Sequence, residues 1–354
     1  MKREFRRGLV VGKFSPLHLG HEFVIRTAME RCREVVLITY SNPEFPGCGA
    51  LRRERWLAEI FPSTLRLVLD PERPSSLAAL PPGLRAMPPN DAPERDHRVF
   101  VGALCTHVLG LTVDAVFTSE DYGDGFAAEL TNWFRRLYPG TPEARHILVD
   151  RERGRFPVSG TALRADFFAR RDWVSPSVGA SLVRRVCLLG GESSGKTTLA
   201  AALGTHFGTA HVPEYGRELW EARGGMLVYE DMVRIAREQI SREEAAALVA
   251  TKRLFCDTSP LATLFYSRRL FGRADPELER LAERKYDLTV LCAPDFPFVQ
   301  DGTRQPPAFR DIQHQWHERE LRRRGLDYFT ARGLVGERVR AVAGELARRF
   351  GENG

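Results

Sequence analysis

The 354-residue sequence predicts an α/β protein made of two parallel-sheet domains. Apolar, strand-like runs alternate with helical patterns along most of the chain, which is typical of parallel sheets covered by helices. The alternation is interrupted at residues 172–179, a stretch that contains serine, proline and glycine, and then begins again. We therefore expect a first domain over residues 1–172, a linker over 173–184 and a second domain over 185–354.

The first half has the periodicity of strands that alternate with helices. Short apolar runs predict the strands, and longer patterns with apolar residues three and four positions apart predict the helices. The expected strands are 8–11, 35–39, 65–69, 115–118 and 147–149, and the expected helices are 20–32, 51–60, 95–109 and 126–138. A proline-rich loop is expected at 81–93.

The second half repeats the alternation with different boundaries. Its expected strands are 185–189, 210–212, 254–256 and 288–291. A helix is expected to begin near Lys196, and others to cover 232–249 and 336–350. The sequence contains no internal repeat and no low-complexity tract, so the two halves are expected to be separate domains that open with different chemistry.

Composition excludes several classes of protein. No apolar run approaches the roughly 18 residues of a membrane helix, and we expect a cytoplasmic protein without a membrane partner. The six cysteines form no Cys-x-x-Cys pair, which argues against a zinc site or a disulfide framework. The net charge of +6 comes from arginines dispersed along the chain, which favours anionic small-molecule substrates over nucleic acid.

A ten-residue motif follows the first expected strand directly. It reads Gly-x-Phe-x-Pro-x-His-x-Gly-His, and the residues expected to act there are Gly12, Lys13, Phe14, His18, Gly20 and His21. Glycines let the backbone approach a triphosphate closely. Histidines at the start of a helix lie where free N–H groups and the helix dipole already favour an anion. The motif predicts an ATP-binding site at which His18, His21 and Lys13 stabilise charge in the transition state.

A second element follows the last expected strand of the first half. The first motif resembles the signature of His-x-Gly-His nucleotidyltransferases, and Ser159, Thr161 and Arg164 resemble the second signature of those enzymes, Ile-Ser-x-Thr-x-x-Arg. The two hydroxyls can cap a helix and contact phosphate. We expect Arg164 to face the leaving pyrophosphate, which places it among the catalytic residues.

The second half opens with a phosphate-binding loop. Residues 190–197 fit Gly-x-x-x-x-Gly-Lys-Thr between an expected strand and an expected helix, which is the context that a P-loop requires. Backbone N–H groups are expected to hold the phosphates, Lys196 to reach the β and γ oxygens, and Thr197 to ligate Mg²⁺. The nucleotide-binding residues are expected to be Gly190, Gly191, Glu192, Ser193, Ser194, Gly195, Lys196, Thr197 and Thr198.

Three further segments of the second half are candidates for substrate contact and catalysis. Glu214, Tyr215 and Arg217 follow the expected strand 210–212 and suit a small polar acceptor. Asp257 follows a buried strand and is expected to ligate Mg²⁺ or to orient the attacking hydroxyl. Arg304 and Arg310 lie in a segment expected to act as a lid over the transferring phosphate.

These motifs, in this order, resemble those of the bifunctional nicotinamide mononucleotide adenylyltransferase / ribosylnicotinamide kinases of the NadR type. The segments that carry the resemblance are 12–21, 119–123, 158–164, 190–197, 214–217, Asp257 and 301–304. The resemblance implies a C-terminal half that phosphorylates nicotinamide riboside with ATP and an N-terminal half that adenylylates nicotinamide mononucleotide to NAD and pyrophosphate. It implies ATP and Mg²⁺ as cofactors and allows a homo-oligomer.

Some members of that family carry an additional N-terminal helix-turn-helix and repress transcription. Here the first catalytic strand begins by residue 8, so we expect no such domain and no DNA binding. Two alternatives remain open at this point. The chain could be an adenylyltransferase–kinase pair for another cofactor precursor, a pantetheine or a flavin, or it could be a non-catalytic protein that senses nucleotides or binds nucleic acid.

Overall fold

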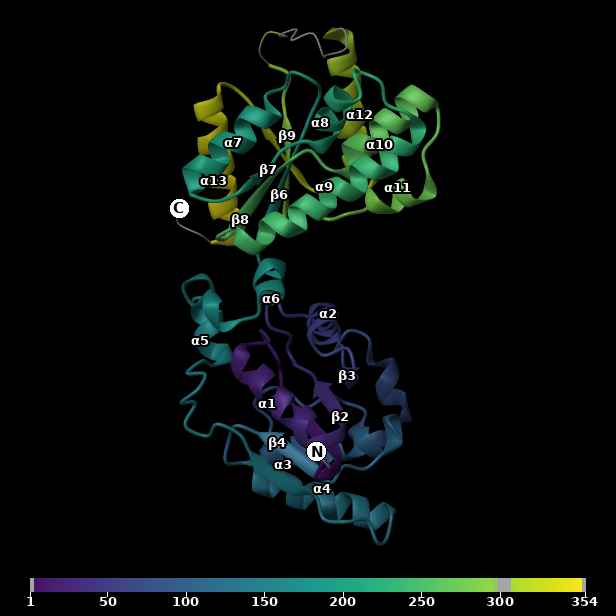
Figure 1. Cartoon of the computed structure of the whole chain (residues 1–354), viewed down its shortest axis with the longest axis vertical. Coiled ribbons are helices and arrows are strands. Elements are labelled where there is room, and N and C mark those ends of the chain that lie inside the picture. Colours follow the sequence, from purple (N-terminus) through teal and green to yellow (C-terminus); the bar gives the residue numbers. More distant parts are fainter. Residues whose placement is uncertain (1–2, 296, 298–306, 352–354) are drawn as a thin grey trace. The chain divides into compact units, whose positions relative to one another are not determined.

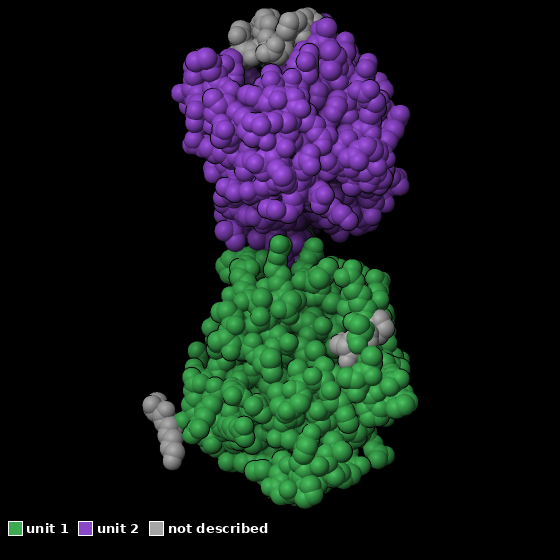
Figure 2. Space-filling model, turned by 90° about the vertical axis from the view of Figure 1, so that its right-hand side faces the viewer, with its two compact units in different colours: residues 1–179 green, residues 180–354 purple. Residues whose placement is uncertain are grey.

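The computed structural model of the chain describes residues 3–295, 297 and 307–351. It divides into two compact units, residues 1–179 and 180–354, drawn in green and purple in Figure 2. The division falls inside the stretch 173–184 that the sequence predicts as a linker. That stretch contains a short helix, α6 (Pro176–Ser181), and its residues Val178 and Val183 are buried.

The first unit is a five-stranded, all-parallel sheet in the order β3-β2-β1-β4-β5. Its strands are β1 (Phe5–Val11), β2 (Cys32–Thr39), β3 (Leu65–Val68), β4 (Ala115–Thr118) and β5 (Arg145–Leu148). Its helices before α6 are α1 (Leu19–Arg31), α2 (Ala50–Ile60), α3 (Glu94–Ala103), α4 (Gly123–Leu137) and α5 (Gly160–Ala165). The chain leaves β1 toward β2 and later returns to β4 on its other side, and in open α/β sheets ligands bind at such a reversal of strand order.

The second unit is another five-stranded parallel sheet, in the order β10-β9-β6-β8-β7. Its strands are β6 (Arg184–Leu189), β7 (His211–Val212), β8 (Arg253–Asp257), β9 (Leu288–Cys292) and β10 (Tyr328–Ala331). Its helices are α7 (Lys196–Phe207), α8 (Tyr215–Ala222), α9 (Tyr229–Val249), α10 (Pro260–Phe271), α11 (Pro276–Leu281), α12 (Pro307–Arg323) and α13 (Val335–Phe350). Figure 1 shows both sheets with their surrounding helices. The predicted fold class, two parallel-sheet α/β domains, is therefore confirmed.

Each sheet is buried by helices because its strands are apolar on both faces. In the first unit Leu9 and Val116 pack in one cluster with Phe100 of α3 and Leu130 of α4, while α1 lies against β1 and β2. In the second unit one cluster joins the sheet to α7 and α13, and another joins it to α8, α9, α10 and α12. This layering leaves the carboxyl ends of the central strands β1 and β6 open for the loops that carry the motifs.

The observed elements differ from the sequence prediction in a few places. The helix expected over 95–109 ends as an α-helix at Ala103 and continues as a π-helical turn, Leu104–Val108. The helices α8, α10, α11 and α12 and the strand β10 were not predicted. The strand β10 is short and only its last residue, Ala331, is buried, so its apolar signal is weak.

Candidate functional sites

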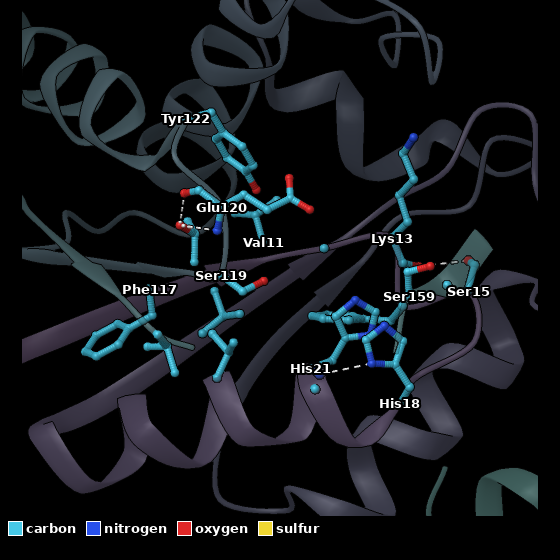
Figure 3. A pocket seen from close by; sticks show the side chains of 18 of the residues that line it. Val11, Lys13, Ser15, His18, His21, Phe117, Ser119, Glu120, Tyr122 and Ser159 are labelled. Carbon is cyan, nitrogen blue, oxygen red and sulfur yellow. Dashed lines mark hydrogen bonds between the residues drawn. The ribbon is translucent and has the colours of Figure 1, made fainter. Parts of the chain in front are cut away.

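A cavity of about 560 Å³ opens in the first unit at the carboxyl ends of β1 and β4 (Figure 3). The loop after β1, the start of α1 and the segment before α5 converge on it. It is lined by all of the residues that the sequence predicts for the first phosphate site: Gly12, Lys13, Phe14, His18, Gly20, His21, Ser159, Thr161 and Arg164. Segments about 140 residues apart in the sequence thus form one site.

The two histidines form a stacked pair at the start of α1. His18 is the N-cap residue, and its Nδ1 accepts the backbone N–H of His21 at 3.3 Å. The two rings stack with their centroids 3.6 Å apart, and the ring of Phe14 packs edge-on against His21. Because Nδ1 of His18 accepts a hydrogen bond, its imidazole carries the proton on Nε2, which remains available to donate to an anion.

The backbone around this pair is tight. A Cβ on Gly12 would lie 2.7 Å from the ring of Phe14, and Phe14 itself has a left-handed φ of 46°. Left-handed backbone is uncommon for aromatic residues and is maintained only where the surrounding structure requires it. The ring of Phe14, the loop after β1 and the two histidines therefore hold one another in place. Electrostatic stabilisation of a triphosphate requires such preorganised groups.

Two cations lie on the same side of the cavity as the loop. Arg164 donates to the backbone carbonyl of Ser15 at 2.6 Å and to Oγ1 of Thr161 at 3.0 Å, and its guanidinium lies over the ring of Phe45. Lys13 donates to the carbonyl of Asn90 at 3.3 Å. Ser159 caps α5 by accepting the N–H of Ala162, so one predicted hydroxyl contributes to the helix start as expected.

Burial keeps both histidines neutral in this site. Loss of solvent lowers the pKa of His18 to about 4, with the charge of Arg153 as a second cause. Burial lowers the pKa of His21 well below its usual range, and His18 and Arg153 lower it further. Burial also lowers the pKa of Lys13, to which nearby Arg164 contributes. A bound polyanion would favour the protonated forms of His18, His21 and Lys13, so the electrostatics of the site favour a phosphate ligand.

Other side chains of the cavity were not predicted from the sequence. Arg153, in left-handed backbone, donates to a carboxylate oxygen of Glu120 at 3.1 Å and to the carbonyl of Val158 at 3.3 Å. Tyr40 and His97 share a hydrogen bond of 2.8 Å on another wall. These residues come from different loops and helices at irregular spacing, so a single sequence contains no signal that would have identified them.

The P-loop of the second unit connects β6 to α7 and has the backbone that phosphate binding requires. Gly190, Ser193 and Gly195 have φ values of 144°, 55° and 79°, so successive N–H groups turn toward one concave side. A Cβ on Gly190 would lie 2.7 Å from the carbonyl oxygen of Cys292. Lys196 donates to the carbonyls of Gly190 and Gly191 at 3.2 and 3.0 Å, which holds its ammonium group at the loop.

Thr197 and Asp257 are brought together as predicted for a nucleotide-bound cation. The hydroxyl of Thr197 donates to Oδ2 of Asp257 at 2.5 Å, and Oδ1 of Asp257 is buried with no hydrogen-bond partner in the described part of the chain. Burial raises the pKa of Asp257, whereas the ammonium of Lys196 lowers it. A hydroxyl beside a carboxylate with an unpaired buried oxygen fits the oxygen ligands that Mg²⁺ prefers. Among the described residues no group of three His, Cys, Asp or Glu side chains could hold a metal.

A second cavity, of about 190 Å³, adjoins the P-loop. Of the three residues predicted to contact the acceptor, Glu214 and Arg217 line it. Tyr215 does not: it is buried in the core, where its backbone N–H donates to Gln239 and the guanidinium of Arg242 covers its ring. The prediction for Tyr215 is therefore wrong, because it begins α8 with its side chain packed among Leu219 and Ile235.

Of the two arginines predicted to belong to a lid, the structure describes only one. Arg304 lies outside the described residues. Arg310 lies near the start of α12, and its backbone carbonyl is so close to Gly191 that no Cβ would fit there. Arg310 is thus beside the P-loop, on a helix that also supplies Gln313, whose Oε1 accepts the N–H of Glu192 at 2.9 Å.

The walls of the second cavity contain aromatic and polar residues that the sequence did not identify. They are Trp220 of α8, Gln239 of α9, Tyr266 of α10 and Phe309 of α12. The hydroxyl of Tyr266 donates to Glu192 at 2.8 Å, and burial raises the pKa of Tyr266 well above its usual range. Aromatic walls beside a carboxylate and a phosphate-binding loop suit a nucleoside with a flat ring.

Fold and sites together define the class of protein: a Rossmann-like domain with a His-x-Gly-His motif, joined to a P-loop domain. Residues 185–338 match a family model described as an AAA domain. The trifunctional NAD biosynthesis/regulator protein NadR of Salmonella typhimurium is 28% identical over 319 residues, which cover 86% of this chain and 72% of the relative.

Two solved NadR structures are also similar. One, in complex with NR, has a TM-score of 0.64 and 20% identity, with 98% of this chain and 97% of that chain covered. The other, in complex with NAD and AMP-PNP, has a TM-score of 0.62 and 20% identity, with 99% and 97% covered. The chain is thus a homologue of the NadR proteins, with both units included in the similarity. No helix in the described ranges is both long and apolar enough to span a membrane.

Proposed function

We propose that the chain is a bifunctional enzyme of NAD salvage. The second unit phosphorylates nicotinamide riboside with ATP, and the first unit joins the resulting mononucleotide to the adenylyl group of ATP. The observation that carries this proposal is the presence, in one chain, of two cavities lined by phosphate-binding motifs of different type, one around His18 and His21 and the other around Lys196 and Thr197. The NadR relatives support the assignment of the substrates.

In the second unit a hydroxyl of the riboside would attack the γ-phosphorus of ATP while the bond to the β-phosphate oxygen breaks. Lys196 and the P-loop N–H groups would stabilise charge on the β and γ oxygens. Glu214, whose pKa is raised by burial and by the nearby Asp257, lies in the cavity where the attacking hydroxyl must enter and could accept its hydrogen bond. Thr197 and Asp257 would hold Mg²⁺ that arrives with the nucleotide, and that ion would neutralise phosphate charge.

In the first unit a phosphate oxygen of the mononucleotide would attack the α-phosphorus of ATP, and pyrophosphate would leave. No covalent enzyme intermediate is needed, so the protein contributes position and charge. Nε2 of His18, the imidazole of His21 and the ammonium of Lys13 are available to stabilise the phosphate oxygens. Arg164, fixed by Ser15 and Thr161, would hold the leaving pyrophosphate.

The proposal is tested by mass spectrometry of the products that purified protein forms from nicotinamide riboside, ATP and Mg²⁺. Nicotinamide mononucleotide should accumulate first and NAD should follow. Riboflavin and pantetheine, assayed in parallel, address the remaining alternative substrates. Phosphorylation or adenylylation of one of these in place of the pyridine substrates would refute the assignment, and absence of any product would refute catalysis.

A further inference from the structure

One polar side chain in the cavity of the second unit has an unusual environment. Gln239 lies in the middle of α9, is only 1% exposed, and nevertheless lines the cavity beside the P-loop. Its Nε2 is buried and has no hydrogen-bond partner among the residues that the structure describes. Buried polar atoms in folded proteins are almost always paired, so an orphaned amide donor at a cavity wall indicates a group that a ligand completes.

The orientation of this amide is fixed by its other end. Oε1 of Gln239 accepts the backbone N–H of Tyr215 at 3.0 Å. The reversed amide would bring two donors together, because the NH₂ group and the backbone N–H can only donate. Hydrogen-bond chemistry therefore assigns Nε2, and not Oε1, as the end left for a ligand. The group that completes it must be an acceptor.

The surroundings indicate which part of a nucleoside would supply that acceptor. Met232 and Ile235 lie on the same face of α9 as Gln239, at helical spacing, and Ala262 and Tyr266 of α10 line the same cavity. An apolar and aromatic wall suits a planar heterocycle better than a hydroxyl-rich sugar. Two of the charged side chains that line the cavity, Glu214 and Arg217, come from the loop after β7 and the start of α8, and they suit the hydroxyls of the sugar. The other two, Glu192 and Lys196, belong to the P-loop.

We propose that Gln239 determines the specificity of the kinase site: its Nε2 donates a hydrogen bond to a carbonyl oxygen carried by the heterocycle of the acceptor nucleoside. This inference rests on the proposed kinase function of the second unit. A nucleoside without that oxygen leaves the donor buried and unpaired, and sites of this kind discriminate strongly against the analogue that lacks the partner.

The experiment compares three ribosides as phosphate acceptors: nicotinamide riboside, 3-acetylpyridine riboside and unsubstituted pyridine riboside. The first two carry a carbonyl oxygen and the third does not. The kcat/KM of each is measured for wild-type protein, Gln239→Met and Gln239→Glu, with melting temperatures as a check on folding. Glu keeps an acceptor for the N–H of Tyr215 and removes only the donor, whereas Met removes both. Glu238→Gln on the same helix is the matched control, because Glu238 pairs with Arg242 and does not line the cavity.

Wild-type protein should prefer both carbonyl-bearing ribosides over pyridine riboside by on the order of tenfold or more in kcat/KM. Both Gln239 variants should lose most of that preference while the KM for ATP is kept, and Glu238→Gln should retain it. The role of Gln239 would be overturned, with the kinase function still standing, if the folded variants kept the preference for carbonyl-bearing ribosides. An equal loss of kcat/KM for all three ribosides would have the same meaning. Wild-type protein that phosphorylates none of the three would overturn the proposed kinase function and this inference with it.

Discussion

At the scale of single residues, the stacked imidazoles at the start of α1 show how burial sets a charge state. The pKa of His18 is lowered to about 4, so between pH 4 and the ordinary histidine value near 6.5 the unfolded chain binds a proton that the folded protein does not. Folding stability is therefore lost as pH falls through this window. We expect the His18 imidazole resonance to stay unchanged from pH 7.5 to about 5 in an NMR titration, in contrast to the usual titration near 6.5.

The variant His18→Asn assigns that resonance and provides a control for the titration. Asparagine can still accept the N–H of His21 as an N-cap, so the helix start is maintained while the titrating group is removed. A resonance absent from this variant that titrates near pH 6.5 in wild-type protein would contradict the burial argument.

His21 affects one activity and not the other. We expect His21→Ala to lower NAD formation from supplied mononucleotide by about 10²- to 10³-fold, the usual cost of losing one preorganised group that stabilises transition-state charge. Phosphorylation of the riboside should remain within about twofold of wild type, because His21 lines only the first cavity. His206→Ala removes an exposed histidine and serves as the control. Unchanged adenylyl transfer in His21→Ala would remove the basis for the site in the first unit.

Lys196 should give the reverse result. Its ammonium is held at the P-loop by two carbonyls and is the cation expected to reach the transferring phosphate. Lys196→Ala should reduce phosphorylation of the riboside by about 10²-fold or more, and adenylylation of supplied mononucleotide should persist. The exposed Lys252 provides the control, as Lys252→Ala. Loss of both activities in a folded Lys196→Ala protein would contradict the two-site model.

At the scale of helices and strands, the sequence predicts those elements whose pattern is set by residues close together in the chain. The strands β1, β4 and β6 are short apolar runs, the helix α7 follows the P-loop motif, and α9 has apolar residues at helical spacing; the structure confirms all five within a few residues. The motif residues were identifiable because each phosphate loop has a fixed spacing between a strand and a helix. The donor of Gln239 and the Arg153–Glu120 pair were not identifiable, because each depends on a neighbour brought close only by the fold. Tyr215 was misassigned for the same reason: its sequence neighbours line the cavity and its own side chain is in the core.

The contact between the P-loop and α12 is a second feature at this scale that can be tested. The Arg310 carbonyl occupies the space where a side chain on Gly191 would begin, so Gly191→Ala must displace either the loop or the helix. We expect this variant to lose about tenfold or more of its kinase activity, since small displacements of a phosphate-binding loop are costly. Adenylyl transfer in the first unit should be unaffected.

The control for this change is Gly344→Ala in α13, where an added Cβ meets nothing within 4 Å. Replacing a glycine inside a helix by alanine at an open position should stabilise the second unit by about 0.5–1 kcal/mol and leave both activities intact. Thermal melts, together with assays of riboside phosphorylation and adenylyl transfer, distinguish Gly191→Ala from Gly344→Ala. Equal kinase activity in Gly191→Ala and Gly344→Ala would show that the loop does not require the close approach of α12.

At the scale of the whole molecule, each unit has its own sheet, core and phosphate site, so the two activities should be separable. The division lies between Gly179 and Ala180. A first fragment should include residues 173–179, because Ser175 donates to Glu22 at the start of α1, and Val174 and Val178 are buried. We expect fragment 1–179 to fold and adenylylate nicotinamide mononucleotide, and fragment 180–354 to fold and phosphorylate the riboside.

The boundary itself is tested by the shorter fragment 1–172. It lacks Ser175, one of the partners of Glu22, and two buried valines, and it should melt several degrees lower than fragment 1–179, since loss of about 2–4 kcal/mol of buried packing has that effect in a domain of this size. Equal melting temperatures for 1–172 and 1–179 would show that residues 173–179 contribute nothing to the first unit.

Mixed together, fragments 1–179 and 180–354 should convert nicotinamide riboside and ATP to NAD, with a lag while free mononucleotide accumulates to the concentration that the second step needs. Failure of both longer fragments to fold would show that the two units are not independent.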